Sequence, residues 1–179
     1  MINDALSVLE ASQGWKEIVS AVEMNRAPQS VAVVLPEAIQ KIFVENYGKL
    51  ILGDSPIWKD GAHPDLINAG RHLEPPSIDE CRTLPGELAL HPLVFDRRMA
   101  VIWSADKLSP EASNSLLKLT EEPPEHGCIL FVSEEDKLIP TIKSRVWSVK
   151  IDLPAEMAQA RPHPASPEEW AEWIAEGKK

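Results

Sequence analysis

Short apolar runs that alternate with segments of helical periodicity predict an α/β fold, in which helices cover both faces of a parallel sheet of about five strands. Strands that are buried on both faces read as nearly unbroken apolar runs, because neither face meets water. Four such runs occupy residues 30–35, 99–103, 128–132 and 147–151, and a weaker one occupies residues 65–68. The 179 residues, 44% of them apolar, are enough for one domain with a proper core, or for one domain and an appendage.

Two amphipathic segments between these runs each predict a helix with one apolar stripe. The stripe residues are Trp15, Ile18, Val19 and Val22 in the first segment, and Ile39, Ile42, Phe43, Tyr47 and Leu50 in the second. A further helix is expected to begin at Pro110, because Ser109 suits an N-cap and proline suits the first helical position. This helix is expected to end before Pro123.

Composition divides the chain into two parts. Residues 1–151 contain all the predicted strands, with a long excursion at residues 53–76 that is rich in Gly, Pro, Asp and His. Residues 152–179 are predicted to be a proline-rich linker and a short helical appendage that carries Trp170 and Trp173. These tryptophans need a partner surface, which is either the main domain or an interface with chain that is missing here.

Charge and cysteine content exclude several classes of protein. Eighteen Lys and Arg against 28 Asp and Glu give a formal net charge of −10, so the chain does not wrap phosphate backbones as a basic protein does. It has no apolar run of about 18 residues, and its first residues lack the features of a signal peptide, so the expected compartment is the cytoplasm. Cys81 and Cys128 are expected to be buried thiols.

The first predicted strand is not followed by a phosphate-binding loop. Ligands in such folds bind at the carboxyl ends of the strands, where a nucleotide-binding protein needs a glycine-rich loop of backbone amides. Here Leu35 and Pro36 lead directly into the next helix, and no glycine lies between Gly14 and Gly48. The sequence therefore predicts no bound nucleotide cofactor.

The predicted strand at residues 99–103 lacks the acids of an ATPase. A Walker-type enzyme places two adjacent acids there, one for magnesium and one to polarise the attacking water. Trp103 and Ser104 occupy these two positions, and Asp106 follows on a turn, where capping or solvation is its expected role. We therefore expect that the chain is not an enzyme by itself.

Other clusters of polar residues predict no site. The spacing of His63, Asp65, His72 and Cys81 matches no zinc pattern, so no metal is expected. His126 and Cys128 are less suited to be a nucleophile pair than a loop residue and a buried thiol. The acidic run at residues 134–136 is typical of a solvated turn, and it dilutes the cluster of cations that follows. These cations are Lys137, Lys143, Arg145 and Lys150.

Five short segments stand in order between residues 101 and 145. They are Ala-Asp-Lys-Leu-Ser at 105–109, Asn-Ser-Leu-Leu-Lys at 114–118, Glu-Glu-Pro-Pro at 121–124, Asp-Lys-Leu-Ile-Pro-Thr-Ile at 136–142 and Ser-Arg at 144–145. Their order and spacing resemble the first domain of bacterial clamp-loader subunits, which are AAA+ proteins of the DNA polymerase III holoenzyme. The resemblance extends over most of residues 14–151 and implies a P-loop-NTPase-type fold.

Departures from the family pattern indicate which subunit the chain resembles. The ATP-hydrolysing subunits keep the phosphate loop, the paired acids and a four-cysteine zinc module, and this sequence lacks all three. It therefore looks like a delta-prime subunit, the member of the family that does not hydrolyse ATP. The example is divergent, because the usual Leu-Leu-Lys-Thr-Leu is written Leu-Leu-Lys-Leu-Thr at 116–120 and the usual Ser-Arg-Cys ends in Val146.

The resemblance implies a catalytic role for Arg145, supported by Ser144, in the ATP site of a neighbouring subunit. An arginine finger supplied in this way offsets the charge that develops on the transferring phosphoryl group. The implied partners are gamma/tau-like ATPase subunits and a delta-like subunit, with the sliding clamp and primed DNA met indirectly; no membrane and no small-molecule substrate are expected. A plainer interpretation makes Arg145 a surface cation that caps carbonyls at a helix end.

Two other functions remain open at this point. The chain could be a stand-alone adaptor that kept the fold but does not act in a clamp loader. This hypothesis arises because the lid and collar of the family do not follow Ile151. Alternatively, the sequence could be a fragment that ends within the lid. An enzyme that acts on nucleotides is a third hypothesis, and it predicts measurable binding of ATP.

Overall fold

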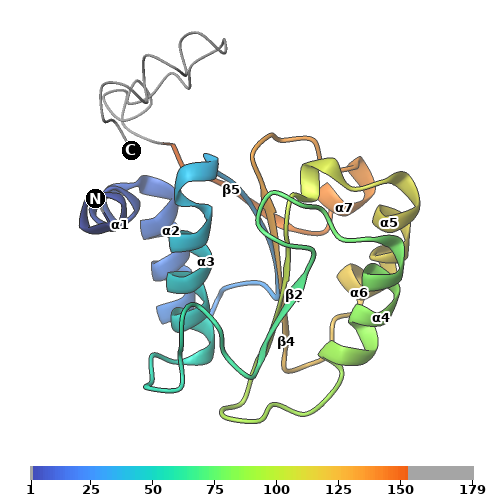
Figure 1. The fold of residues 1–179 in the computed structure, drawn as a ribbon, viewed down its shortest axis with the longest axis horizontal. Coiled ribbons are helices and arrows are strands. Elements are labelled where there is room, and N and C mark those ends of the chain that lie inside the picture. Colours follow the sequence, from blue (N-terminus) through green and yellow to red (C-terminus); the bar gives the residue numbers. More distant parts are fainter. Residues whose placement is uncertain (1, 153–179) are drawn as a thin grey trace, which may run out of the picture.

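A computed structural model describes residues 2–152 and shows a parallel sheet between two layers of helices (Figure 1). The strands lie in the order β2-β3-β4-β1-β5, and each neighbouring pair is parallel. Their bounds are β1 (Ser30–Val34), β2 (Leu66–Ala69), β3 (Arg98–Ile102), β4 (Gly127–Ser133) and β5 (Trp147–Lys150). The predicted fold class is confirmed, and each of the five apolar runs forms a strand.

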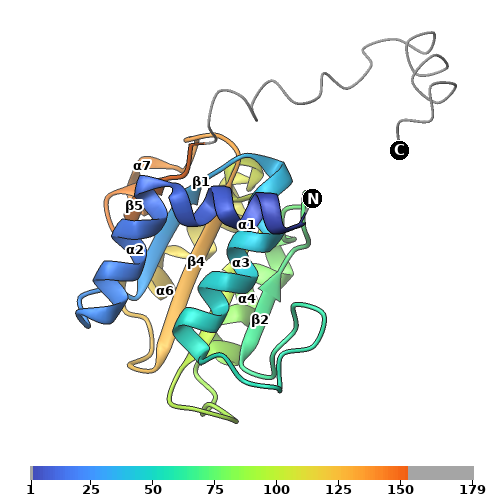
Figure 2. The same ribbon diagram turned by 90° about the vertical axis from the view of Figure 1, so that its left-hand side faces the viewer.

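Helices cover both faces of the sheet. The layer of α1, α2 and α3 lies on one face, and the layer of α4 to α7 lies on the other (Figures 1 and 2). Their bounds are α1 (Ile2–Ala11), α2 (Gln13–Glu23), α3 (Glu37–Leu52), α4 (Ile78–Leu88), α5 (Pro110–Ser115), α6 (Leu117–Glu121) and α7 (Pro140–Lys143), with a 3₁₀ turn, η1, at Ala105–Lys107. No helix within the described part of the chain is long and apolar enough to span a membrane.

The alternation of side chains along the strands divides the core into two. Val31 and Val33 of β1 belong to the cluster under α1 to α3, whereas Ala32 belongs to the cluster under α4 to α7. This follows from the strand geometry, in which successive side chains point to opposite faces. Both cysteines are buried as expected, Cys128 in the first cluster and Cys81 in the second.

Three helices, α1, α4 and α7, were not anticipated from the sequence. Helix α1 packs on α2 and α3. Helix α4 begins with a capping box: the hydroxyl of Ser77 accepts a hydrogen bond from the backbone N–H of Glu80 (3.2 Å), and the Glu80 carboxylate accepts one from the backbone N–H of Ser77 (2.8 Å). The Ser77 hydroxyl also donates to the Glu80 carboxylate (2.8 Å), and the two bonds that Ser77 donates to this carboxylate lower the pKa of Glu80. A serine followed three residues later by glutamate is a recognisable start signal.

The helix expected to run from Pro110 to Pro123 is divided at Leu116. Its start is as predicted, because the Ser109 hydroxyl accepts a hydrogen bond from the backbone N–H of Ala112 (3.1 Å). Near the break the Ser115 hydroxyl donates to the carbonyl of Ala112 (2.7 Å), and so competes with the helical hydrogen bonds. Two short helices, α5 and α6, replace the single long one.

A buried carboxylate, that of Asp65, organises the end of the sheet at which β2 and β3 begin. Asp65 accepts hydrogen bonds from the backbone N–H groups of Leu93 (2.7 Å) and Val94 (2.9 Å). The guanidinium of Arg98, itself nearly buried, lies 4.0 Å from the same carboxylate. Asp65 thereby fixes the loop between α4 and β3, on which the side chains of Leu93 and Phe95 stand exposed to solvent.

The predicted boundary at Ile151 stays a prediction. Strand β5 and Ile151 complete the described domain, and Ile151 is buried in the first core cluster. The expected linker and the helix with Trp170 and Trp173 lie outside the described residues.

Replacing Gly14 by alanine is expected to lower the free energy of unfolding by about 1–3 kcal/mol, although alanine is the better helix former. A Cβ at this position would lie 2.5 Å from the carbonyl oxygen of Lys150, so α2 would have to move away from β5. Gly86→Ala is the matched control, since nothing lies within 4 Å of its Cβ, and it is expected to raise stability by about 0.5–1 kcal/mol. Urea denaturation of both variants measures the difference, and equal effects would contradict it.

Candidate functional site

The junction of β1 and α3 occupies the position of a phosphate loop. Leu35 donates its backbone N–H to the carbonyl of Ser133 (3.0 Å), and the Leu35 carbonyl accepts from the buried amide of Gln40 (3.3 Å). Pro36 follows at the N-cap of α3 and has no N–H to donate. The chain therefore turns from strand to helix in two residues, Leu35 and Pro36. The carbonyl groups of both residues accept hydrogen bonds from within the domain.

The end of β3 is filled by an aromatic cluster where an ATPase would have acids. The Trp103 side chain is buried, and its indole N–H donates to the Asn68 side chain (2.9 Å). The ring of His72 meets the indole edge-on, with the ring centres 5.6 Å apart. Ser104 comes next in a left-handed conformation, with φ of 47°. Asp106 accepts a hydrogen bond from the backbone N–H of Glu135 (3.4 Å), so it supports the turn after β4.

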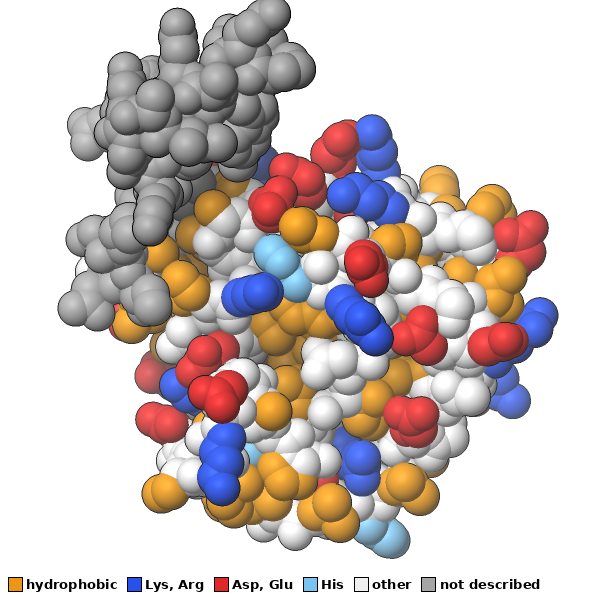
Figure 3. All heavy atoms as spheres, viewed as in Figure 1, with side chains coloured by type: hydrophobic (Ala, Val, Ile, Leu, Met, Phe, Trp, Pro, Cys, Tyr) orange, Lys and Arg blue, Asp and Glu red, His pale blue; other side chains and the backbone are white. Residues whose placement is uncertain are grey.

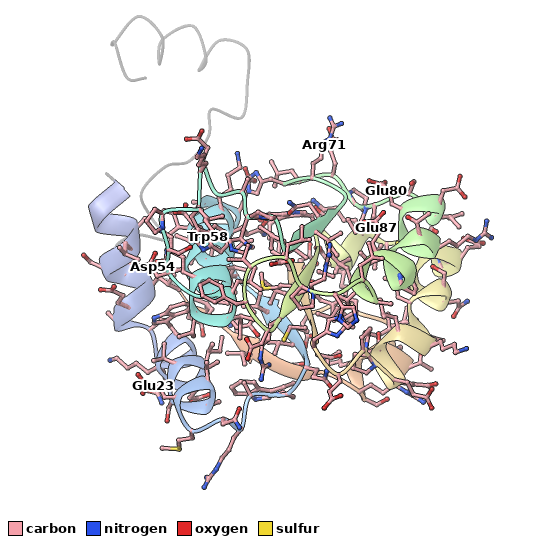
Figure 4. All side chains as sticks on the ribbon, turned by 90° about the horizontal axis from the view of Figure 1, so that it is seen from below. Glu23, Asp54, Trp58, Arg71, Glu80 and Glu87 are labelled. Carbon is pink, nitrogen blue, oxygen red and sulfur yellow. The ribbon has the colours of Figure 1, made fainter. Side chains whose placement is uncertain are left out.

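A hollow of about 380 Å³ opens beside Trp103, between α3, β2 and the loop at residues 53–65. Glu45 and Lys41 of α3 and Asp60 of the loop contribute charges of both signs to its lining. The loop is held against α3 by Trp58, whose indole N–H donates to the Gly53 carbonyl (2.9 Å) (Figure 4). The mixture of charges selects no single class of ligand.

Arg145 lies on the surface just after α7, beside the end of α6. One nitrogen of its guanidinium, Nη1, donates to the carbonyl of Thr141 (2.7 Å) and to the hydroxyl of Ser144 (3.1 Å). The other, Nη2, is 2.8 Å from a carboxylate oxygen of Glu121. The Ser144 hydroxyl in turn donates to the Thr141 carbonyl (3.1 Å). The two residues singled out in the sequence are therefore in contact, and Arg145 caps a carbonyl of α7.

The cations of the cluster that the sequence places around Arg145 are paired with acids. Each has a carboxylate partner: Lys137 pairs with Glu135, Lys143 with Asp136, Arg145 with Glu121 and Lys150 with Asp152. The hydrogen bond that the Lys137 ammonium donates to the Glu135 carboxylate raises the pKa of Lys137. Figure 3 shows acidic and basic side chains interspersed over the described part of one face of the molecule. Such a surface offers no extended positive field to a nucleic acid.

The side chains considered as a metal set, His63, Asp65, His72 and Cys81, lie in different surroundings. His63 accepts a hydrogen bond at Nδ1 from the backbone N–H of Asp65 (3.1 Å), and burial lowers the pKa of its imidazole. His72 packs on Trp103, and burial raises the pKa of the Cys81 thiol to about 11. Within residues 2–152, no group of three or more His, Cys, Asp or Glu side chains is arranged to hold a metal ion.

His126 and Cys128 do not form a nucleophile pair in the structure. A ring nitrogen of His126 is 3.1 Å from the carbonyl of Leu88, and its ring stacks on that of His91. Cys128 is buried on β4 next to Arg97, and burial raises the pKa of its thiol. A thiol with a raised pKa is a poor nucleophile at neutral pH.

The strand order and the two helical layers give the domain an AAA+-like fold of P-loop-NTPase type. A crystal structure from Thermotoga maritima, of a DNA polymerase III gamma subunit-related protein, has the same fold. The two structures superpose with a TM-score of 0.62 at 23% identity, over 79% of this chain and 47% of that one.

The chain belongs to the DNA polymerase III delta subunit family, whose model matches residues 56–155. Within that family it is a divergent, delta-prime-like member. It is 31% identical over 116 residues to the DNA polymerase III subunit delta' of Pseudomonas aeruginosa, a match that covers 61% of this chain and 35% of that protein. A DNA polymerase III subunit gamma/tau of Mycobacterium bovis is 35% identical over 69 residues, which are 38% of this chain and 12% of that protein. The chain thus spans about a third of the delta' relative.

Sequence reasoning missed the partners of the candidate residues. Glu121 stands in the Glu-Glu-Pro-Pro segment that supports the family resemblance, but no periodicity relates it to Arg145. Asn68 and Trp103 are likewise joined only because β2 and β3 are neighbours in the sheet. An exposed acid before two prolines was the one available signal, and it points to no particular cation.

Proposed function

We propose that this chain is a non-hydrolysing, delta-prime-like subunit of a bacterial clamp loader, and that it supplies Arg145 as an arginine finger to the ATP site of a neighbouring subunit. In this role it helps to load the sliding clamp on primed DNA. The observation that carries the proposal is the position of Arg145. Its guanidinium lies on the surface, in a Ser-Arg pair within the segment that the family model matches.

The chain's own residues support a partner role rather than hydrolysis. At the position of the phosphate loop, the carbonyl and the amide of Leu35 are bound within the domain. At the position of the two acids, Trp103 is committed to Asn68 and to the core. A subunit that binds no ATP can still complete a neighbour's site, because a trans arginine needs only to reach the phosphoryl group.

The partners follow from the relatives and from the surface charge. Since the relatives are named as delta' and gamma/tau subunits of DNA polymerase III, we assign gamma/tau-like ATPase subunits and a delta-like subunit as partners. The net charge of −10 and the paired cations favour contact with proteins, so that clamp and DNA are met through the assembly. Residues 152–179 would begin the lid, and the site of action would be the bacterial cytoplasm.

Replacing Arg145 by alanine is expected to lower the DNA-stimulated ATPase rate of the reconstituted loader at least about tenfold at the site that this chain completes, because trans fingers contribute on the order of a thousandfold. Steady-state phosphate release measures the effect. Lys143→Ala is the matched control, because it removes a cation of α7 that pairs with Asp136. Equal rates for Arg145→Ala and the unmodified subunit would refute the finger.

One observation favours a second function, that of a stand-alone adaptor. The guanidinium of Arg145 bonds to three groups of its own domain, as a residue with a purely structural role would. An adaptor would not co-purify with ATPase subunits of the same cell, and Arg145→Ala would then change only its stability. A pull-down that uses the full chain as bait separates the two functions.

A further inference from the structure

The guanidinium of Arg145 is turned toward its own domain. An arginine side chain has five N–H donors, two on each terminal nitrogen and one on Nε. Nη1 donates hydrogen bonds to the Thr141 carbonyl and the Ser144 hydroxyl, and Nη2 forms an ion pair with the Glu121 carboxylate at 2.8 Å. A finger that completes a neighbour's ATP site must point away from its own domain. The conformation seen here is therefore not the one that would reach a phosphoryl group.

Glu121 is the contact that competes most directly with a phosphate. It is the last residue of α6, and its carboxylate meets Arg145 from across the contact between α6 and α7. Carboxylate and phosphate oxygens are recognised by the same planar fork of N–H groups. The carbonyl of Thr141 and the hydroxyl of Ser144 are uncharged, so they compete less strongly with a phosphate for the guanidinium of Arg145.

We propose that Glu121 is a positioning residue, which holds Arg145 in a stowed position until the phosphate of ATP on a neighbouring subunit replaces its carboxylate. The exchange is one of ion pairs only, in which no covalent bond forms or breaks. This inference rests on the proposed function, because it needs Arg145 to act in trans. It adds a second residue, from a different helix, to that site.

The exposure of the pair sets the size of the expected effect. The side chains of Arg145 and Glu121 are 38% and 46% exposed, so water and salt weaken their attraction. Exposed pairs of this kind shift an equilibrium by about two- to fivefold. A nucleotide phosphate carries more negative charge than one carboxylate, so it displaces Glu121 when the neighbouring site is filled.

The test is the ATP dependence of the reconstituted loader with the chain carrying Glu121→Gln. Releasing Arg145 is expected to lower the ATP concentration for half-maximal hydrolysis about two- to fivefold, with an unchanged maximal rate. Glu122→Gln is the matched control: it removes the same charge one residue later, and Glu122 has no ion pair in the described part of the chain. In the double variant Glu121→Gln, Arg145→Ala, the ATP dependence is expected to equal that of Arg145→Ala alone.

Each of the other outcomes contradicts either the inference about Glu121 or the proposed function. If Glu121→Gln and Glu122→Gln have the same ATP dependence while Arg145→Ala lowers the rate, the finger stands and the stowing by Glu121 is wrong. If Glu121→Gln lowers the maximal rate, Glu121 assists the reaction and does not withhold Arg145, which also overturns the inference. If Arg145→Ala has no effect, the proposed function itself fails. Thermal unfolding of each variant confirms that the surface substitutions leave the domain folded.

Discussion

Replacing Asp65 by alanine is expected to lower the free energy of unfolding by about 3–5 kcal/mol. The carboxylate is fully buried and accepts two backbone hydrogen bonds, from Leu93 and Val94. It also faces the guanidinium of Arg98, whose side chain is only 9% exposed. Alanine leaves two amides without an acceptor and a buried cation without its counter-charge, and neither can be rehydrated without opening the loop. Urea denaturation followed by circular dichroism measures the change.

The control for Asp65 lies on the loop that it fixes. Asp96 is exposed, so Asp96→Ala is expected to change stability by less than about 0.5 kcal/mol. Asp65→Asn keeps one acceptor oxygen and should fall between the two. A loss below about 1 kcal/mol for Asp65→Ala would show that water replaces the carboxylate, and so contradict the buried network.

Replacing Trp103 by alanine is expected to destabilise the domain by about 3–5 kcal/mol, as is usual for a large buried aromatic side chain. Trp103 is 7% exposed and joins the core under α1 to α3, while its indole N–H is bonded to Asn68. An ATPase would carry an acid at this position, at the end of β3. The packing of Trp103 instead predicts a structural role. Chemical denaturation gives the size of the loss.

Trp103→Phe separates packing from hydrogen bonding at this position. The phenyl ring keeps most of the apolar contacts and loses the bond to Asn68, so the expected loss is about 1 kcal/mol. If alanine and phenylalanine cost the same, the hydrogen bond and not the core contact would hold the end of β3. Retention of full stability by both variants would contradict the structural role altogether.

The strands could be predicted from the sequence because burial on both faces leaves a direct mark in composition. Residues 128–132 are wholly apolar, and β4 is buried along its whole length. Helix α4 left a mark too, in Ser77 and Glu80, but Pro85 within it and few apolar residues hide its periodicity. The break at Leu116 depends on which hydrogen bond the Ser115 hydroxyl makes, and competing local bonds of this kind are not visible in periodicity.

The candidate site divides in the same way. Arg145 and Ser144 could be singled out from the sequence, because the segments that carry the family resemblance follow one another along the chain. The pairing of Arg145 with Glu121 depends on how α6 lies against α7, and that is a property of tertiary packing. The cluster of Trp103, Asn68 and His72 similarly joins two separate segments, β2 with the loop after it and the end of β3.

The sheet order has a consequence for how the chain folds. Strand β1 lies between β4 and β5, so Ser30 finds its partner, Ile129, only after most of the domain has been synthesised. Such distant pairings slow folding, because a long loop must close before the contact forms. Until β4 leaves the ribosome, the apolar residues of β1 have no strand beside them. The amide of Gln29, which binds the carbonyls of Pro124 and Gly127, would then help to register the two strands as they meet.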